Sequence, residues 1–366
     1  MTDCRRRALQ NKLSSTISTI MEFKLYALSP VGVRVCRWVR WIVMVVRPLK
    51  WIDGELRLLD QRALPGLTIW LTLTDLESVV QAIRDMAVRG APAIGVTAAY
   101  GMAIAARAGI DRAEAQRRLA ASRPTAVNLF WALDRINAMP EWSFAAVLAE
   151  ARCIEEEDRT ANEAIGAFGE DLIPEGARIL TLCNTGALAT AGHGTALGVI
   201  RSAHRAEKNI FVFSCETRPR QQGLRLTAWE LMQEGIPFAS IADSAAGWLM
   251  REGRVDVAIA GADRIAANGD TANKIGTYTV AVLAARHGIP FYIAAPNSTL
   301  DPHMQNGHDI PIEERCAEEL TEIEGIRIAP IGTPVVNPAF DVTPGELITA
   351  IITETGVHRP PYRFQP

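Results

Sequence analysis

Two side chains that can carry acid–base chemistry stand just after apolar stretches of the sequence. Cys183 follows the apolar run 179–182, and Asp263 follows the run 255–260 and a Gly-Ala turn. Nearby cations or a helix N-terminus can lower the pKa of a thiol from its ordinary value of about 8.5. Partial burial raises the pKa of a carboxyl, which can then donate a proton near neutrality. A small buried hydrophobe and a turn residue are the structural alternatives.

Several residues in predicted loops can bind an anionic ligand. Asn273 and Lys274 precede a Gly-Thr pair that can open a helix, and a lysine beside helix-start N–H groups suits an anion. Arg89 stands before Gly90 and Ala91 in a stretch that joins two predicted helices. Glycine there lets the backbone approach a ligand, and arginine supplies charge. A solvated lysine and a simple turn between helices are the structural alternatives.

Other patterns argue against metal and nucleotide sites. None of the six cysteines forms a CxxC pair and the histidines lie mostly apart, so no zinc signature is present. The glycines at 192–198 are spaced GxGxxxG and begin ten residues after the apolar run 179–182, which does not fit a dinucleotide fingerprint. The acidic run 155–158 is typical of a solvated helix face.

The order of apolar patterns predicts a mixed α/β fold. A strand–turn–strand pattern at 51–56 comes before a region, 74–169, in which apolar residues recur at helical spacing. Short apolar runs then alternate with helical segments, at 179–182, 210–213, 238–242, 255–260 and 291–294. This alternation favours a doubly wound, Rossmann-like parallel sheet. Ligands bind beyond the carboxyl ends of such strands, so we expect Cys183 and Asp263 to meet there.

Length and charge predict how the chain is divided. Its 366 residues suggest two domains, and the net charge of −3 gives no basic field of the kind that binds nucleic acid. Residues 1–43 have a net charge of +6 and are predicted to be a non-native or disordered extension, with translation starting at Met44. An organelle presequence is the alternative. We predict a mainly helical N-terminal domain with a small β element at 44–172, and a Rossmann-like catalytic domain at 173–366.

Composition also bears on the cellular location. The longest uninterrupted apolar runs, of which 41–46 is one, are far shorter than the roughly 20 residues of a membrane-spanning helix, so we expect no membrane insertion. Unpaired cysteines without a secretory signal favour a reducing compartment. We therefore expect a cytoplasmic protein.

Six motifs occur in the same order as in a known family. They are RGAPAIG at 89–95, RPTAVNL at 123–129, CNTG at 183–186, ETRPRQQG at 216–223, GADRI at 261–265 and NKIGT at 273–277. From about Met44 onward the chain resembles the methylthioribose-1-phosphate isomerase family. The superfamily also holds regulatory subunits of translation-initiation exchange factors. The resemblance implies conversion of 5-methylthioribose 1-phosphate to 5-methylthioribulose 1-phosphate in methionine salvage, by a homodimer without metal or organic cofactor.

The resemblance also assigns residues to this aldose–ketose conversion. It implies that Cys183 and Asp263 are the catalytic pair. The substrate contacts that it implies are Arg89, Gly90, Ala91, Arg123, Gln222, Asn273 and Lys274. The anomeric oxygen carries the phosphate, so an acid must assist opening of the ring, and protonated Asp263 is the candidate.

The sequence leaves two questions open. Hydrogen can move from C2 to C1 as a hydride, or a Cys183 thiolate can act as base in a phosphoenolate route. The substrate can instead be ribose 1,5-bisphosphate or another 5-deoxypentose 1-phosphate. A non-catalytic exchange-factor-type regulatory subunit is the alternative from another functional class, and the presence of the catalytic pair argues against it.

Overall fold

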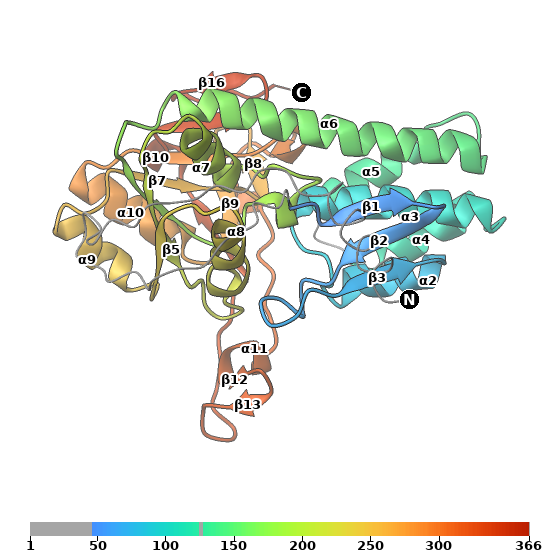
Figure 1. Cartoon of the computed structure of the whole chain (residues 1–366), viewed down its shortest axis with the longest axis horizontal. Helices are drawn as coiled ribbons and strands as arrows, with labels where there is room; N and C mark the ends of the chain where they lie inside the picture. The colour runs from blue at the N-terminus through green and yellow to red at the C-terminus, as the bar shows by residue number, and fades with distance from the viewer. Residues whose placement is uncertain (1–45, 124–126, 366) are drawn as a thin grey trace, which may run out of the picture.

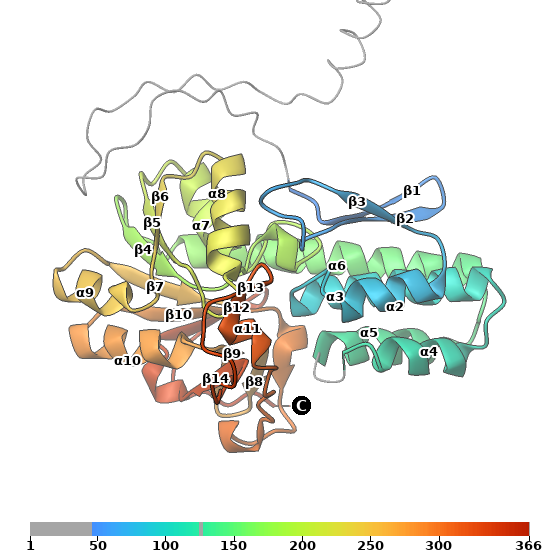
Figure 2. The ribbon, with the colours of Figure 1, turned by 90° about the horizontal axis from the view of Figure 1, so that it is seen from below.

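The computed structural model describes residues 46–123 and 127–365, so the predicted extension 1–43 lies outside the described residues. The described chain is a mixed α/β structure (Figures 1 and 2). Its N-terminal elements are β1 (Leu49–Ile52), β2 (Glu55–Leu59), β3 (Trp70–Leu73), α2 (Leu76–Arg84), α3 (Ala91–Arg107), α4 (Arg112–Ala120), α5 (Val127–Asn137) and α6 (Phe144–Glu170). The three strands pair antiparallel in the order β1-β2-β3. The first two match the predicted strand–turn–strand pattern, whereas β3 was not predicted.

Capping residues fix where these helices begin. The side chain of Asp75 accepts the N–H of Ser78 at 2.8 Å ahead of α2, and Ser143 caps α6. Helix α3 begins at Ala91, so the predicted loop between the helices is shorter than expected. Proline suits the first turn of a helix, and Pro92 occupies that turn.

A mainly parallel sheet forms the centre of the C-terminal part, as predicted. Its strands are β4 (Arg178–Thr181), β5 (Phe211–Cys215), β6 (Phe238–Ile241), β7 (Val257–Ala260), β10 (Phe291–Ala294), β15 (Ala350–Thr353) and β16 (Gly356–His358). They lie in the order β16-β15-β10-β7-β4-β5-β6, and β16 pairs antiparallel with β15. Without β16, this strand order is that of the doubly wound folds that bind dinucleotides. The sequence patterns missed β15 and β16.

Helices pack on both faces of this sheet because its strands are apolar on both sides. Neighbouring strand residues point in opposite directions, so Leu180 and Ile179 of β4 belong to different cores. One face is covered by α9 (Ala245–Arg251) and α10 (Thr277–His287). The other face is covered by α6, α7 (Ala196–Arg205) and α8 (Ala228–Gln233), which continues the π-helical turn η2 (Gly223–Thr227).

Helix α6 joins the two halves of the molecule (Figure 1). Its 27 residues span roughly 40 Å at about 1.5 Å per residue. Val147, Ala151 and Ile154 pack into the core of the N-terminal helices, whereas Ile165 packs against the parallel sheet. The prediction of a solvated face at 155–158 is wrong for Asp158, whose carboxylate accepts the N–H of Ala191 at 2.7 Å.

A second, smaller sheet and a projecting segment complete the fold. The small sheet has the order β11 (Leu300–Asp301), β8 (Arg264–Ala266), β9 (Thr271–Lys274) and β14 (Phe340–Thr343). The projecting arm consists of α11 (Glu318–Thr321), β12 (Glu322–Ile323) and β13 (Ile326–Arg327) and extends from the body in Figure 1. Sequence patterns predicted neither. Short 3₁₀ turns lie at η1 (Ala187–Ala189), η3 (Asn297–Thr299), η4 (Gly307–Asp309) and η5 (Gly345–Leu347).

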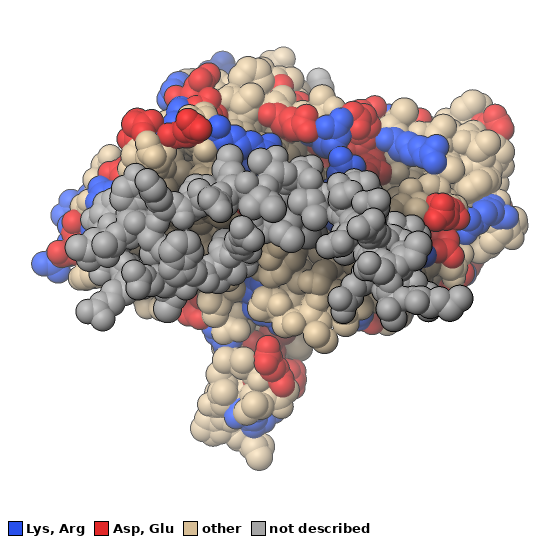
Figure 3. Space-filling view, viewed as in Figure 1, with Lys and Arg blue, Asp and Glu red and all other residues tan. Residues whose placement is uncertain are grey.

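The surface of the described residues has mixed charge. In the part of the face that Figure 3 leaves visible, basic and acidic side chains are interspersed. The arm exposes the aliphatic side chain of Ile326, and the segment that follows the arm exposes those of Ile331 and Val336. Among the described residues, none of the helices combines the length and apolar character that a membrane crossing requires.

Truncating the core of the central strand should destabilise the protein. Leu180 is fully buried in β4, so we expect Leu180→Ala to lower the free energy of unfolding by about 2–5 kcal/mol. Val282→Ala, at an exposed position of α10, should change it by less than about 0.5 kcal/mol. Urea unfolding followed by circular dichroism measures both values, and equal effects of the two variants would contradict the assignment of Leu180 to the core.

Candidate functional site

Two neighbouring strands of the parallel sheet end at one cavity. Strands β4 and β7 pair directly, although β5 and β6 lie between them in the sequence. The chain therefore reverses its direction of sheet growth between β4 and β7, which is where doubly wound folds bind ligands. Cys183 follows the end of β4 and Asp263 follows the end of β7, and both line a cavity of about 100 Å³.

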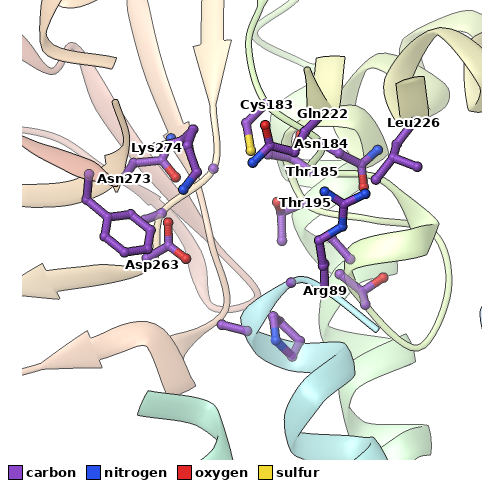
Figure 4. A pocket seen from close by; sticks show the side chains of 18 of the residues that line it. Arg89, Cys183, Asn184, Thr185, Thr195, Gln222, Leu226, Asp263, Asn273 and Lys274 are labelled. Carbon is purple, nitrogen blue, oxygen red and sulfur yellow. The ribbon is translucent and has the colours of Figure 1, made fainter. Parts of the chain in front are cut away.

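All the site residues named from the sequence line this cavity. They are Arg89, Gly90, Ala91, Arg123, Cys183, Gln222, Asp263, Asn273 and Lys274. Figure 4 shows Asp263, Asn273 and Lys274 on one side, with Cys183, Gln222 and Arg89 across from them. The segments that follow β4, β5 and β7 and the loop before α3 thus line one cavity. The geometry tests only their proximity, and their roles stay predictions.

Cys183 has an unusual backbone and a shielded thiol. Its φ of +62° lies in the left-handed region, which is unfavourable for a residue other than glycine and is often found at functional sites. Burial raises the pKa of the Cys183 thiol, and the nearby charge of Lys274 opposes this shift only in part. The predicted lowering by cations is therefore outweighed, and the site favours the neutral thiol over the thiolate. Cys215 is buried in β5, and burial raises its pKa to about 12, in line with a structural role.

The environment of the Asp263 carboxyl suits it to donate a proton near neutrality. Burial raises its pKa, and Lys274 and Arg123 reduce the shift without cancelling it. Arg264, the next residue in the chain, pairs with Asp301 at 3.5 Å. A raised pKa keeps the carboxyl protonated at higher pH than an ordinary aspartic acid, so Asp263 can donate a proton.

The cavity is rich in cations. Arg220 and Arg315 line it together with Arg89, Arg123 and Lys274, whereas Asp263 is the carboxyl-bearing residue of its described lining. Burial lowers the pKa of Arg89 to about 10, with a further contribution from the charge of Arg220. It also lowers the pKa of Lys274. This excess of positive charge suits an anionic ligand such as a phosphate.

The five cationic side chains differ in the contacts that they make with the rest of the protein. Glu319 of the arm forms ion pairs with Arg220 and Arg315. Lys274 donates to the carbonyl oxygen of Ala339 at 2.9 Å, and its Nζ lies 4.1 Å from the ring centroid of Phe340. These contacts hold the cations at the wall while leaving hydrogen-bonding capacity for a ligand.

Three buried polar atoms in the lining have no hydrogen-bond partner among the described residues. Nε of Arg315 still lies 3.1 Å from a carboxylate oxygen of Glu313, which leaves Nε of Arg89, a donor, and Oε1 of Gln222, an acceptor. Buried polar groups are nearly always paired, so this pair favours a polar ligand in the cavity. Gly90 lets the backbone next to Arg89 approach η1 closely, because a Cβ on Gly90 would lie 2.3 Å from the carbonyl oxygen of Ala189.

Other lining residues were missed from the sequence. Asn184, Thr185 and Arg220 belong to motifs already quoted, so their place in those motifs was the available signal. Arg315 and Phe340 flank the projecting arm, for which the sequence offered no periodic pattern. Within the described residues, groups of three or more histidine, cysteine, aspartate or glutamate side chains arranged to hold a metal ion do not occur.

Comparisons with known proteins place these features in context. A family model described as the Initiation factor 2 subunit family matches residues 87–360. A protein from Alcanivorax borkumensis named methylthioribose-1-phosphate isomerase is 55% identical over 324 residues, covering 85% of this chain and 94% of that protein.

Two solved structures are similar over most of the chain. The crystal structure of 5-methylthioribose 1-phosphate isomerase from Pyrococcus horikoshii OT3 has a TM-score of 0.81 and 44% identity, covering 86% of this chain and 93% of that one. A structure from A. fulgidus, titled translation initiation factor eIF-2B, subunit delta, has a TM-score of 0.77 and 46% identity, covering 87% and 97%.

The pH dependence of alkylation should reveal the raised pKa of Cys183. We expect its reaction with iodoacetamide to have a midpoint above the ordinary thiol value of about 8.5, since the thiolate is the reactive form. Lys274→Gln should raise the midpoint further, because the lysine charge favours the thiolate. Lys208→Gln, which removes a lysine paired with Glu170 away from the cavity, is the matched control. Peptide mass spectrometry separates Cys183 from the other cysteines, and a midpoint below 8.5 would contradict this account.

Proposed function

Because this chain belongs to the Initiation factor 2 subunit family, and within it to the methylthioribose-1-phosphate isomerases, we propose that its cation-lined cavity is the active site. The protein is an aldose–ketose isomerase that converts 5-methylthioribose 1-phosphate into 5-methylthioribulose 1-phosphate, a reaction of methionine salvage. The convergence of Cys183 and Asp263 in one cavity is the observation that carries the assignment of the site.

Substrate binding depends on the positive charge of the cavity. Arg89, Arg123 and Lys274 bind the phosphate and the sugar oxygens, while Gln222 and Asn273 bind hydroxyl groups. The unpaired Arg89 Nε and Gln222 Oε1 support this division, because a phosphate accepts hydrogen bonds and a sugar hydroxyl can donate one. Fixing the phosphate orients C1 and C2 toward the catalytic pair.

Asp263 acts as the acid that opens the ring. Its protonated carboxyl gives the proton to the ring oxygen while the bond between C1 and that oxygen breaks. The phosphate stays on C1, which becomes cationic. The raised pKa of Asp263 supports this role, since the carboxyl holds its proton until the substrate accepts it.

Hydrogen transfer then completes the isomerisation. A hydride moves from C2 to C1, the C2 hydroxyl becomes the carbonyl, and its proton returns to the Asp263 carboxylate. The alternative is removal of the C2 proton by Cys183 and its return to C1 through a phosphoenolate. The raised pKa of Cys183 favours the hydride route, because a neutral thiol is a poor base. In this route the buried thiol forms part of the cavity wall that shields the cation at C1 from solvent.

A second substrate is compatible with the charge of the site. Five cationic side chains of the described residues line the cavity. This is more positive charge than one phosphate needs, so ribose 1,5-bisphosphate is the second candidate substrate. Met86, Leu226 and Phe340 also line it and instead suit an apolar methylthio group. Pairing of Arg220 and Arg315 with Glu319 reduces the charge available for a second phosphate. We therefore favour the methylthio sugar.

The finer organisation of the protein is also a proposal. Separate cores in the two halves support a mainly helical N-terminal domain at 44–172 and a doubly wound catalytic domain at 173–366. The family resemblance supports a homodimer. We propose a cytoplasmic location on two grounds. The protein acts as an enzyme on a small phosphosugar, and the described cysteines are unpaired.

Substitution of the catalytic pair should abolish turnover. We expect Cys183→Ser and Asp263→Asn each to lower kcat on 5-methylthioribose 1-phosphate by a factor of about 10² or more. Cys153→Ser and Asp309→Asn, at exposed positions away from the cavity, should stay within about twofold of wild type.

The same assay with ribose 1,5-bisphosphate decides between the two substrates. Faster wild-type turnover of the bisphosphate would reject the preferred substrate. Near-wild-type turnover of 5-methylthioribose 1-phosphate by folded Cys183→Ser and Asp263→Asn variants would reject the assigned catalytic roles.

An isotope label distinguishes the two routes of hydrogen transfer. With deuterium at C2 of the substrate, the hydride route should keep the label at C1 of the product in ordinary water. In the phosphoenolate route, the proton on a cysteine thiol can exchange with solvent and the label is diluted. Proton NMR of the product measures the label at C1, and extensive loss at early conversion would contradict the hydride route.

A further inference from the structure

We propose that Thr217 and Thr227 are positioning residues, whose hydroxyl groups hold the backbone of Cys183 in its left-handed conformation and so fix the thiol in the cavity. Thr217 belongs to the ETRPRQQG motif, whose predicted function was assigned to Gln222 alone. This inference rests on the proposed function, in which Cys183 is one of the catalytic pair.

The two threonines bind both polar backbone groups of the same residue. The N–H of Cys183 donates to Oγ1 of Thr217 at 2.8 Å. The hydroxyl of Thr227 donates to the carbonyl oxygen of Cys183 at 2.6 Å. Cys183 has a φ of +62°, a backbone conformation that is energetically unfavourable for residues other than glycine. The two hydrogen bonds therefore hold a strained residue in place. A strained backbone conformation persists where several contacts of the surrounding structure hold it. Here one hydrogen bond holds the N–H of Cys183 and another holds its carbonyl group.

Each hydroxyl has a consistent donor and acceptor arrangement. Thr217 accepts from Cys183 and donates its own hydrogen to the carbonyl oxygen of Cys215 at 3.2 Å. Thr227 donates to Cys183 and accepts from Nδ2 of Asn184 at 3.2 Å. Both threonines are almost fully buried, so water cannot replace either hydroxyl at low cost.

Thr217 is itself fixed by the end of the next strand. The carboxylate of Asp243, which follows β6, accepts the N–H of Thr217 at 2.8 Å and that of Arg218 at 2.7 Å. Gly223 completes the arrangement, because a Cβ there would lie 1.7 Å from the carbonyl oxygen of Cys215 and 3.0 Å from Thr217 Oγ1. The ends of β4, β5 and β6 are therefore connected by hydrogen bonds that lead to Cys183.

The threonines act through Cys183 and not on a ligand. Neither Thr217 nor Thr227 lines the cavity, whereas Cys183 and Asn184 do. Replacing threonine with valine conserves the shape of the side chain but removes the hydroxyl, which leaves a buried N–H or carbonyl of Cys183 without its partner. Serine keeps the hydroxyl and removes only a methyl group.

The experiment compares Thr217→Val and Thr227→Val with Thr217→Ser and Thr227→Ser in the full-length protein. We expect each valine variant to lower kcat on 5-methylthioribose 1-phosphate at least tenfold while KM changes less than threefold, because the thiol loses its position but the phosphate contacts remain. Each serine variant should recover kcat to within threefold of wild type.

Alkylation of Cys183 by iodoacetamide provides a readout that does not depend on turnover. Burial raises the pKa of this thiol, so a loosened turn should hydrate it. The valine variants should therefore react at least threefold faster with a lower pH midpoint, and the serine variants should resemble wild type. If wild type does not isomerise the sugar phosphate, the proposed function fails while the alkylation comparison still tests the positioning role.

Two results would overturn the proposal. One is a folded valine variant with kcat and Cys183 alkylation within twofold of wild type. The other is a serine variant as impaired as its valine counterpart. Circular dichroism establishes folding, and Thr217→Ala and Thr227→Ala replace any valine variant that does not fold, with the same expected losses.

Discussion

The direct pairing of β4 with β7 is the constraint on which the site depends. Parallel strands end at the same edge of a sheet, so this one pairing places the segments that carry Cys183 and Asp263 next to each other. Apolar packing on both faces stabilises the pairing, with Leu180 and Ala258 in one core and Ile179 and Val257 in the other. The chemistry of the cavity therefore rests on an interaction made entirely by backbone and apolar side chains.

Burial has opposite consequences for the two kinds of charged group in the cavity. It lowers the pKa of Lys274 and also that of Arg89, which at about 10 still leaves the guanidinium protonated near neutrality. It raises the pKa of Asp263, which favours the protonated carboxyl. A single physical effect thus gives a site that attracts an anion and also holds an acid ready to donate.

Sequence reasoning predicted the central sheet well because buried parallel strands are short, apolar and bounded by turns. The runs near 179–182 and 291–294 lie at β4 and β10. It missed β15, although that strand is just as apolar, and it missed the arm, which has neither helical nor alternating periodicity. The candidate site residues came from strand ends and from motif order. Their gathering in one cavity follows from strand order, which no local pattern of the sequence contains.

The sequence also could not reveal the balance of electrostatic effects at the site. The sequence places Arg264 directly after Asp263, but Arg264 pairs with Asp301 on the neighbouring strand of the small sheet. It allowed a lowered thiol pKa for Cys183, because the cations were visible and the extent of burial was not. Burial is a property of the whole fold, so the direction of both shifts became clear only with the structure.

The continuous helix α6 has a thermodynamic consequence for the whole enzyme. One end of it packs with the N-terminal helices and the other end with the parallel sheet, without a break in between. Unfolding of either core would remove the apolar contacts that α6 makes with it, and this loss would weaken the core that remains folded. The free energies of the two halves are therefore coupled, and the cooperativity of unfolding extends across the cavity that we propose as the active site.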